Sequence, residues 1–418
     1  MNEPSSGVAA PKPHEAKRFA AGLVAFSAAI SVPMTYCYFV LPAVLREAGH
    51  PAEIVATIAL VYLPYALRVL WAPLVDRFGG DSPLRFRRLA LVCLVANVLA
   101  LVAFIPFDPA KGITGVFGVA ITMSFLSGTG QTAIDGYVLR VWDESGRRRA
   151  PGQQAIGFAA GGVIVGVGVL IIDGQGWSAT VGLLIAVSVT CMLLFLFLPR
   201  IPEARITVNA TRVSAGLGRF MCSGPALQLM ALSLMINGGM GLIGGYLPIF
   251  QVDSGLSSGQ AGMFGAVGSN LCGLLAAMIA GVLVVRFGGW VVLAGVGVIT
   301  ALVFAAISLA HPTVSGPIFA VLTTFAAMSL GYIYLIGHRA LSLSASGGPR
   351  AASQTAYLSS FDFSVVIIFG SMSGLIAATI GVSGLFALAS GTTLIGGLAA
   401  FAIGGRRLSE PVSKIHQT

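Results

Sequence analysis

Charged residues are scarce in this chain of 418 residues: they make up 9% of the sequence, whereas 56% of it is hydrophobic. A typical soluble domain carries roughly 25% charged residues. Too few charges are therefore present to cover a surface that faces water on all sides. The composition predicts a protein whose partners include the lipid bilayer.

Cysteine is also scarce, and paired metal-binding motifs are missing. The five cysteines stand singly with no CxxC pair, and the sequence contains no HExxH motif. Single cysteines in apolar runs are interpreted as small apolar fillers. We therefore expect no metal, no cofactor other than a coupling proton, and no membrane-embedded enzyme.

Long apolar runs occupy most of the chain, and each is long enough to cross a hydrocarbon layer of ~30 Å. The hydropathy pattern predicts an all-α membrane protein with twelve transmembrane helices. The expected spans lie near residues 19–41, 52–73, 89–107, 114–139, 153–173, 177–199, 225–250, 259–283, 290–310, 314–336, 353–378 and 383–404.

Basic residues follow the loops rather than one face of the protein. With the N-terminus inside, 21 of the 24 lysines and arginines fall on the cytoplasmic side, Arg46 and Lys111 fall outside, and Arg68 falls within a span. This bias predicts that both termini are cytoplasmic. The net charge of +9 is thereby explained by topology, so no nucleic-acid partner is expected. No cleavable signal pattern precedes the first span.

The two halves of the chain resemble each other. The stretch at 75–80, Val-Asp-Arg-Phe-Gly-Gly, returns as Val-Val-Arg-Phe-Gly-Gly at 284–289. Two similar halves are typical of secondary transporters, whose substrate site lies between them. The predicted parts are a cytoplasmic tail (1–18), a six-helix bundle (19–199), a central loop (200–224), a second six-helix bundle (225–404) and a second tail (405–418).

The loop after the second span carries a known pattern. Asp76, Arg77 and Gly79, followed by further arginines, resemble the Gly-x-x-x-Asp-Arg-x-Gly-Arg signature of the major facilitator superfamily, although the first glycine is absent. The resemblance implies two pseudo-symmetric six-helix bundles and a loop that stabilises the outward-facing state. Asp76 is expected to meet Arg140 or the N-terminus of a helix, where anions are favoured.

A narrower resemblance rests on the run from Leu63 to Arg77 (Leu-Pro-Tyr-Ala-Leu-Arg-Val-Leu-Trp-Ala-Pro-Leu-Val-Asp-Arg) together with the stretch from Leu41 to Gly49. Both resemble the AmpG-related permeases, and the stretch from Gly130 to Tyr137 in the fourth span, which keeps Asp135, supports this. That group includes muropeptide permeases and siderophore importers of the RhtX/FptX type. Muropeptide permeases of this kind tend to have extra spans near the C-terminus, so a chain with twelve spans favours the siderophore branch.

Ionisable residues inside spans are costly and mark candidate substrate or ion pathways. Arg68 and Asp135 lie at a similar depth, about 8 Å from the inner surface at ~1.5 Å per residue. We expect them to pair, either as a gate or proton-coupled pair, or as a static pair that neutralises Arg68. Asp362 lies near the midplane, where it either carries the coupling proton or is hydrogen-bonded to a neighbouring span. His338 and Arg339 either line the inner vestibule or belong to a surface loop, the latter being preferred; His338 is a second proton candidate.

Polar and aromatic side chains on several spans are candidates for binding the substrate. They are Tyr36, Tyr38, Gln131, Asn237, Asn270, Tyr332 and Tyr334. For Tyr36 and Tyr38, which lie near the outer end of the first span, an interfacial aromatic belt is an equal alternative.

Together these features predict a monomeric inner-membrane transporter that takes up a small-molecule substrate by alternating access, driven by protons. The leading substrate is a siderophore or its iron complex, and an anhydromuropeptide is the alternative. A receptor or scaffold that does not transport is the alternative from another class.

Overall fold

The computed structural model describes most of the chain, and its helices account for nearly all of that part. The described residues are 13–41, 44–45, 57–109, 112–142, 144–171, 176–198, 217–256, 260, 263–347 and 350–409. Arg46, Lys111 and most of the predicted central loop lie outside them.

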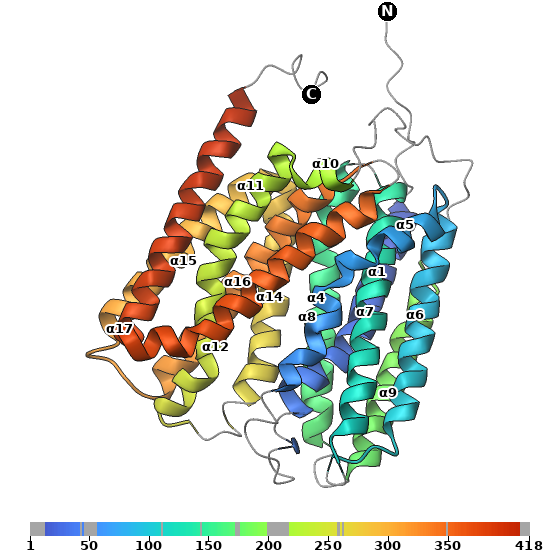
Figure 1. The fold of residues 1–418 in the computed structure, drawn as a ribbon, viewed down its shortest axis with the longest axis horizontal. Coiled ribbons are helices and arrows are strands. Elements are labelled where there is room, and N and C mark those ends of the chain that lie inside the picture. Colours follow the sequence, from blue (N-terminus) through green and yellow to red (C-terminus); the bar gives the residue numbers. More distant parts are fainter. Residues whose placement is uncertain are drawn as a thin grey trace, which may run out of the picture.

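The first half of the chain, up to residue 198, forms one group of helices, which lies to the right in Figure 1. Its elements are α1 (Pro13–Thr35), η1 (Tyr36–Val40), η2 (Thr57–Tyr62), α4 (Leu63–Ala66), η3 (Arg68–Leu70), α5 (Ala72–Gly79), α6 (Pro83–Phe104), α7 (Thr114–Val141), α8 (Glu144–Ile171) and α9 (Trp177–Phe195).

The second half, from residue 217, forms the group to the left in Figure 1. Its elements are α10 (Leu217–Met221), α11 (Gly224–Leu232), η5 (Ser233–Asn237), α12 (Gly238–Asp253), η6 (Phe264–Gly268), α14 (Ser269–Phe287), α15 (Gly289–Ala310), α16 (Pro317–Ala345) and α17 (Ala351–Ser409). Helix α1 begins and α17 ends on the same side of the bundle, the upper one in Figure 1. We call this the terminal side.

The predicted all-α membrane fold with twelve helices is confirmed. Nine helices among the described residues are long and apolar enough to cross a membrane. The last of them, α17, is two crossings, because Gly381 has a φ of 76° that interrupts the helix. Helix α7 and the broken segment 57–79 supply the remaining two crossings.

The second crossing is not the continuous helix that the apolar run predicts. Between residues 57 and 79 it alternates short 3-10 and α-helical pieces. Pro64 and Pro73 lie at the starts of α4 and α5, where proline is tolerated because the first N–H groups of a helix have no partner within it. The break between these pieces holds the buried residue Arg68.

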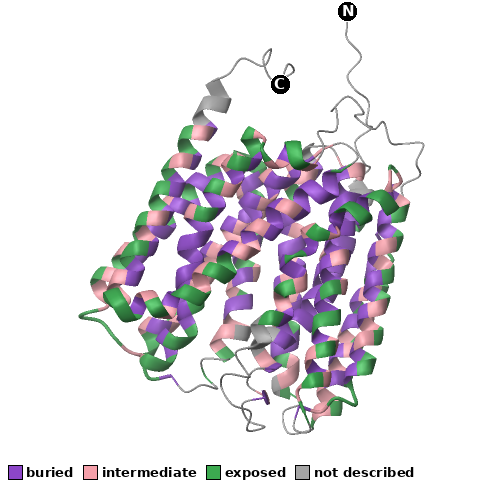
Figure 2. Cartoon of the chain, viewed as in Figure 1, coloured by how far each residue is buried: buried purple, intermediate pink, exposed green. Residues whose placement is uncertain are grey.

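The outer surface of the helix bundle is apolar, as a surface in contact with lipid must be. Figure 2 shows exposed residues along the outer faces of the helices and buried residues between them. Leu309 is 81% exposed, Ile318 77% and Phe401 73%. In water each such side chain would cost free energy, so the exposed face matches a bilayer rather than a solvent.

Each half has hydrophobic cores of its own, and small clusters join the halves. Two clusters consist almost entirely of residues from the first half, and three lie within the second half. A further cluster packs Ala155 of α8 against α14 and α16. A Cβ atom on Gly152 of α8 would lie 3.0 Å from the Cα of Gly281, so glycine is what lets α8 and α14 approach this closely.

Candidate functional site

The first buried polar cluster of the described residues surrounds Asp362 in α17, and the side chains that donate to its carboxyl belong to the second half. Its Oδ1 accepts hydrogen bonds from Ser233 Oγ at 2.6 Å, Tyr334 Oη at 2.8 Å and Asn237 Nδ2 at 3.0 Å. Of the two interpretations offered for Asp362, the contacts agree with a carboxyl bonded to neighbouring spans.

A π-helical turn explains how two of these donors reach the same oxygen. Ser233 and Asn237 are the first and last residues of η5, where the seventh crossing widens between α11 and α12. A π-helical turn inserts one extra residue into an α-helix, and such turns are frequent at functional sites. The i, i+4 spacing keeps both residues on one face, and that face is turned toward α17.

His338 completes the Asp362 cluster, and the prediction that favoured a surface loop for it is wrong. It lies inside α16, 3% exposed, because this helix continues to Ala345 rather than ending near residue 336. Its Nδ1 is 3.9 Å from Asp362 Oδ2, and its Nε2 is 3.2 Å from the Leu229 carbonyl oxygen. The imidazole also stacks on Tyr334, with centroids 5.4 Å apart.

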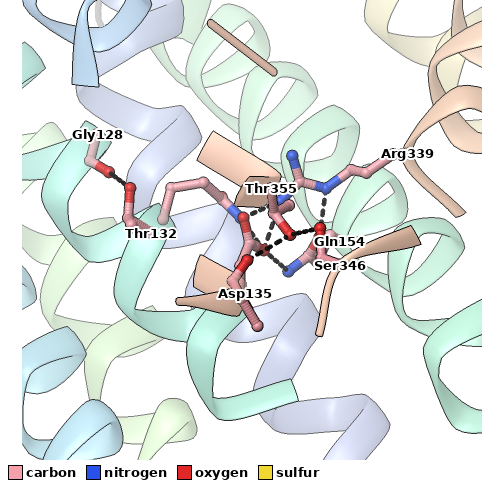
Figure 3. Close-up of polar contacts among 9 residues, drawn as sticks. Gly128, Thr132, Asp135, Gln154, Arg339, Ser346 and Thr355 are labelled. Atoms are coloured by element: carbon pink, nitrogen blue, oxygen red, sulfur yellow. Dashed lines mark hydrogen bonds and ion pairs between the residues drawn. The ribbon is translucent and has the colours of Figure 1, made fainter. Parts of the chain in front are cut away.

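A second buried cluster joins the two halves, and Figure 3 shows it in close-up. Arg339 of α16 donates from Nη2 to both carboxylate oxygens of Asp135 in α7, at 2.5 and 2.7 Å. Its Nε donates to Gln154 Oε1 of α8 at 2.9 Å, and Gln154 and Gln131 both donate to Asp135 Oδ1. The cluster thus fastens one second-half helix to two first-half helices.

The predicted pair of Arg68 and Asp135 is therefore wrong, because Asp135 is paired with Arg339 instead. Depth alone suggested the pair, and depth does not specify the direction in which a side chain leaves its helix. Arg68 is fully buried, and its Nε, Nη1 and Nη2 atoms have no hydrogen-bond partner among the described residues. Its guanidinium group lies 4.4 Å from the centre of the Tyr65 ring.

Asp76 makes both contacts that the sequence suggested for it. Its carboxylate accepts from the backbone N–H of Ala352 at 3.3 Å and of Ser353 at 2.7 Å, at the N-terminus of α17. The Ser353 hydroxyl donates to it at 2.5 Å, and Arg140 Nη2 lies 3.9 Å away.

The other residues of this loop motif have different surroundings. Arg77 is exposed, whereas Gly79 is buried beneath the Phe86 ring, where a Cβ atom would lie 2.2 Å from ring carbons. Arg140 also contacts this ring, with its guanidinium carbon 4.2 Å from the centre. Phe86 is thus fixed between the loop and α7, on the terminal side.

The predicted substrate-binding residues divide into three groups. Gln131, Asn237 and Tyr334 belong to the two buried clusters. Tyr332 donates to Asn270 Oδ1 at 3.1 Å, where α14 and α16 face α8. The assignment of Tyr36 to the cavity is wrong: it packs in a first-half core beside Trp177, with ring centroids 6.2 Å apart. The side chain of Tyr38 lies outside the described residues.

Several residues of these clusters were not predicted from the sequence. Gln154, Ser233 and Ser353 carry no charge and stand in apolar or small-residue surroundings, so composition gives them no weight. The spacing of Ser233 and Asn237 was a usable signal, because polar residues at i and i+4 in an apolar span share one face. Gln154 and Ser353 become visible only when helices from different halves are brought together.

These arrangements define a class of protein: a bundle of two groups of helices, joined by a buried ion pair and by hydrogen bonds from the start of α17 to Asp76, with a buried acid in the second half. The family model for the Major Facilitator Superfamily matches residues 19–367. The chain therefore belongs to the Major Facilitator Superfamily, and it is a multi-pass membrane transport protein rather than an enzyme.

Relatives with curated descriptions have low sequence identity to the chain. "Putative transporter AmpG 4" of Rickettsia felis is 24% identical over 295 residues, covering 67% of this chain and 69% of that protein. Its namesake in Rickettsia conorii is 22% identical over 323 residues, covering 73% and 78%. A crystal structure of the E. coli fucose:proton symporter FucP superposes with a TM-score of 0.68 at 16% identity, covering 94% of this chain and 98% of that one, and shows the same fold.

Proposed function

We propose that this protein is a proton-coupled secondary transporter that imports an organic solute by alternating access. The observation that carries the proposal is the contact of two titratable groups, Asp362 and His338, buried together in the second half. They join two crossings of that half, since Asp362 belongs to α17 and His338 to α16. Proton relays in transporters are built from such buried carboxyl and imidazole groups.

The geometry of the pair favours the binding of one proton. A carbonyl oxygen only accepts, so the contact with Leu229 assigns the proton of a neutral imidazole to Nε2. The lone pair of Nδ1 then points toward Asp362 Oδ2, an arrangement that is repulsive when the carboxyl is ionised. One added proton, on either group, turns this repulsion into attraction, so the pair offers a site for a single proton.

The substrate proposal follows from two resemblances. The Leu63–Arg77 run resembles the AmpG-related permeases as a group, and the twelve crossings favour its siderophore branch. The AmpG name of the curated relatives supports an anhydromuropeptide as a second candidate. Both are polar organic molecules too large for a simple ion channel. We propose the siderophore as the first solute to test and the anhydromuropeptide as its direct rival.

The proposed setting is the bacterial inner membrane, with both termini in the cytoplasm and the protein acting as a monomer. The bias of lysine and arginine toward alternate loops supports this orientation. A cytoplasmic reporter fused after Thr418 should be active, and a periplasmic reporter at the same position should be silent. The reverse result would place the terminal side outside.

The decisive experiment measures solute uptake into proteoliposomes with an imposed pH gradient. The wild type should accumulate one of the two solutes above equilibrium when the outside is acidic. Asp362→Asn removes the titration but keeps the size of the side chain, so it should still exchange solute without a gradient and should lose accumulation. Asp253→Asn is the matched control, because Asp253 is an exposed aspartate at the end of α12.

Three results would contradict the proposal in different ways. Accumulation by Asp362→Asn at the wild-type level would make Asp362 structural. Accumulation by the wild type that ignores the pH gradient would exclude proton coupling. Binding of a solute by the wild type without any exchange would favour the receptor alternative.

A further inference from the structure

Arg68 is a fully buried cation whose hydrogen-bonding capacity is unused. It is 0% exposed, and none of its three guanidinium nitrogens has a hydrogen-bond partner among the described residues. Asp135, the carboxylate that the sequence suggested as its partner, instead accepts hydrogen bonds from Arg339, Gln131 and Gln154. A buried charge without a partner is strongly destabilising. Its retention in the second crossing therefore calls for a functional explanation.

Arg68 lies where the two halves meet, beside two aromatic rings that contact each other. Its guanidinium carbon is 4.4 Å from the centre of the Tyr65 ring, in the first half, and 5.7 Å from that of Phe363, in α17. The two rings are in edge contact, 5.1 Å apart. The neighbouring backbone is also tied across the halves, because the Val69 N–H donates to Ser360 Oγ at 3.3 Å.

The aromatic rings stabilise the charge but leave its N–H groups without acceptors. A cation–π contact is worth about 2 kcal/mol when desolvated, which is less than the cost of burying an isolated charge. The cation–π contacts use none of the guanidinium N–H groups as hydrogen-bond donors, so these N–H groups can still bind an acceptor. Those N–H groups form a rigid fork that matches a carboxylate with two parallel hydrogen bonds.

We propose that Arg68 binds an anionic group, a carboxylate, of the transported solute, with Tyr65 and Phe363 flanking it. This inference rests on the proposed transport function and narrows its substrate class to organic anions. Phe363 directly follows Asp362 on α17. One helix therefore contacts the proposed anion site with one residue and carries the proposed proton site on the next. A solute with one negative charge and a proton would then cross together without net charge.

The test compares each acid with its own amide, so that size and shape stay constant. The probes are an anhydromuropeptide with free carboxylates, a carboxylate-bearing ferric siderophore, and the carboxamide derivative of each. Binding is measured as thermal stabilisation of the full-length protein in detergent, which needs no transport. For at least one pair, the wild type should bind the acid about tenfold or more tightly than the amide, a difference of ~1.4 kcal/mol.

Two variants of Arg68 assign that preference to the residue. Arg68→Gln should bring acid and amide to within about twofold of each other, and Arg68→Lys should keep part of the preference because it keeps the charge but not the fork. Arg286→Gln, at an exposed arginine, is the control and should retain the wild-type ratio.

The proposal is overturned if the wild type does not prefer the acid in either pair, which includes the case that it binds none of the probes. It is also overturned if Arg68→Gln keeps the full preference. If Arg68→Gln does not fold, the ratio of acid to amide binding in the wild type and in Arg68→Lys still tests the proposal. The result is distinct from a failure of proton coupling: Asp362→Asn should keep the preference for the acid, whereas an absence of proton coupling would appear as wild-type uptake that ignores the pH gradient.

Discussion

The carboxylate of Asp135 lies 2.5 Å from the guanidinium group of Arg339, although the two residues are 204 positions apart in the chain. The pair is buried, with side chains 1% and 13% exposed, and it connects α7 of the first half to α16 of the second. Alternating access requires the two halves to separate on one side. Under the proposed alternating access this ion pair would break whenever the terminal side opens, and we propose that it acts as a lock on that side.

Removing one partner should weaken the lock and destabilise the protein. Asp135→Asn leaves Arg339 buried without a counter-charge, and loss of one partner of a buried pair typically costs about 3–5 kcal/mol. We expect a lower melting temperature and greater access from the terminal side. Access is measured by thiol labelling of Ala356→Cys, a buried reporter in α17, after the exposed Cys222 has been replaced by serine.

The double exchange Asp135→Arg with Arg339→Asp provides the control for pairing. The double variant should lose less stability than the sum of the losses in the two single variants, because the opposite charges meet again. Exchange of Arg68 with Asp135 should restore nothing. Strictly additive losses in the first cycle would mean that the two side chains do not stabilise each other.

The fold could be predicted from the sequence because lipid imposes a simple rule. Each crossing must be a long apolar helix, so the positions of most helices follow from hydropathy alone. The exception is the second crossing, where Pro64 and Pro73 break the helix within an apolar run. The end of α16 was also misplaced, because His338 and Arg339 look like loop residues until their buried partners are known.

The candidate site was only partly predictable, for a physical reason. Residue type and depth identified Asp135, Asp362 and Asp76, since buried charges are rare in membrane spans. Pairing depends on helix rotation and on contacts between halves, and neither is encoded in local sequence. Asp135 and Arg339 accordingly pair across the interface, while Arg68 has no hydrogen-bond partner among the described residues.

Asp76→Ala should open the terminal side without unfolding the protein. The substitution removes the acceptor for two backbone N–H groups and one hydroxyl at the start of α17. A helix N-terminus that loses an anion loses about 0.3–1 kcal/mol, up to ~2 kcal/mol when partly buried. We expect faster labelling of the Ala356→Cys reporter and a small fall in melting temperature.

Asp81→Ala is the matched control for Asp76→Ala, because Asp81 is an exposed aspartate just after α5, the helix that contains Asp76. In the Asp81→Ala protein, the Ala356→Cys reporter should be labelled at the rate seen without that change. If Asp76→Ala also labels at that rate, the contact with α17 anchors the loop but does not hold the terminal side closed.

Gly79→Ala should destabilise the protein through a steric clash. A Cβ atom at this position would lie 2.2 Å from the ring of Phe86, which is buried. Overpacking of this kind costs about 1–3 kcal/mol, so the melting temperature in detergent should fall. Phe86→Leu should reduce the additional loss caused by Gly79→Ala, because the smaller side chain leaves room for the methyl group.

Gly118→Ala, at a helical glycine with open space around it, should have little effect. An equal response of the two glycines would remove the steric explanation.

His338→Gln tests whether the imidazole shares the coupling proton with Asp362. In the wild type the added proton can occupy either group, so two microscopic forms contribute to proton binding. Glutamine leaves only the carboxyl, and proton binding is then weaker. The external pH that gives half-maximal uptake should therefore fall, by about 0.3 pH unit when the two forms are equally populated and by more when the imidazole form dominates. Exchange of solute without a gradient should persist, because the hydrogen bonds from Ser233, Asn237 and Tyr334 to Asp362 are untouched.

His311→Gln, at a histidine at the end of α15, should keep the wild-type pH profile. An unchanged profile in His338→Gln would assign the proton to Asp362 alone, and a loss of exchange would show that His338 is needed to hold the cluster together.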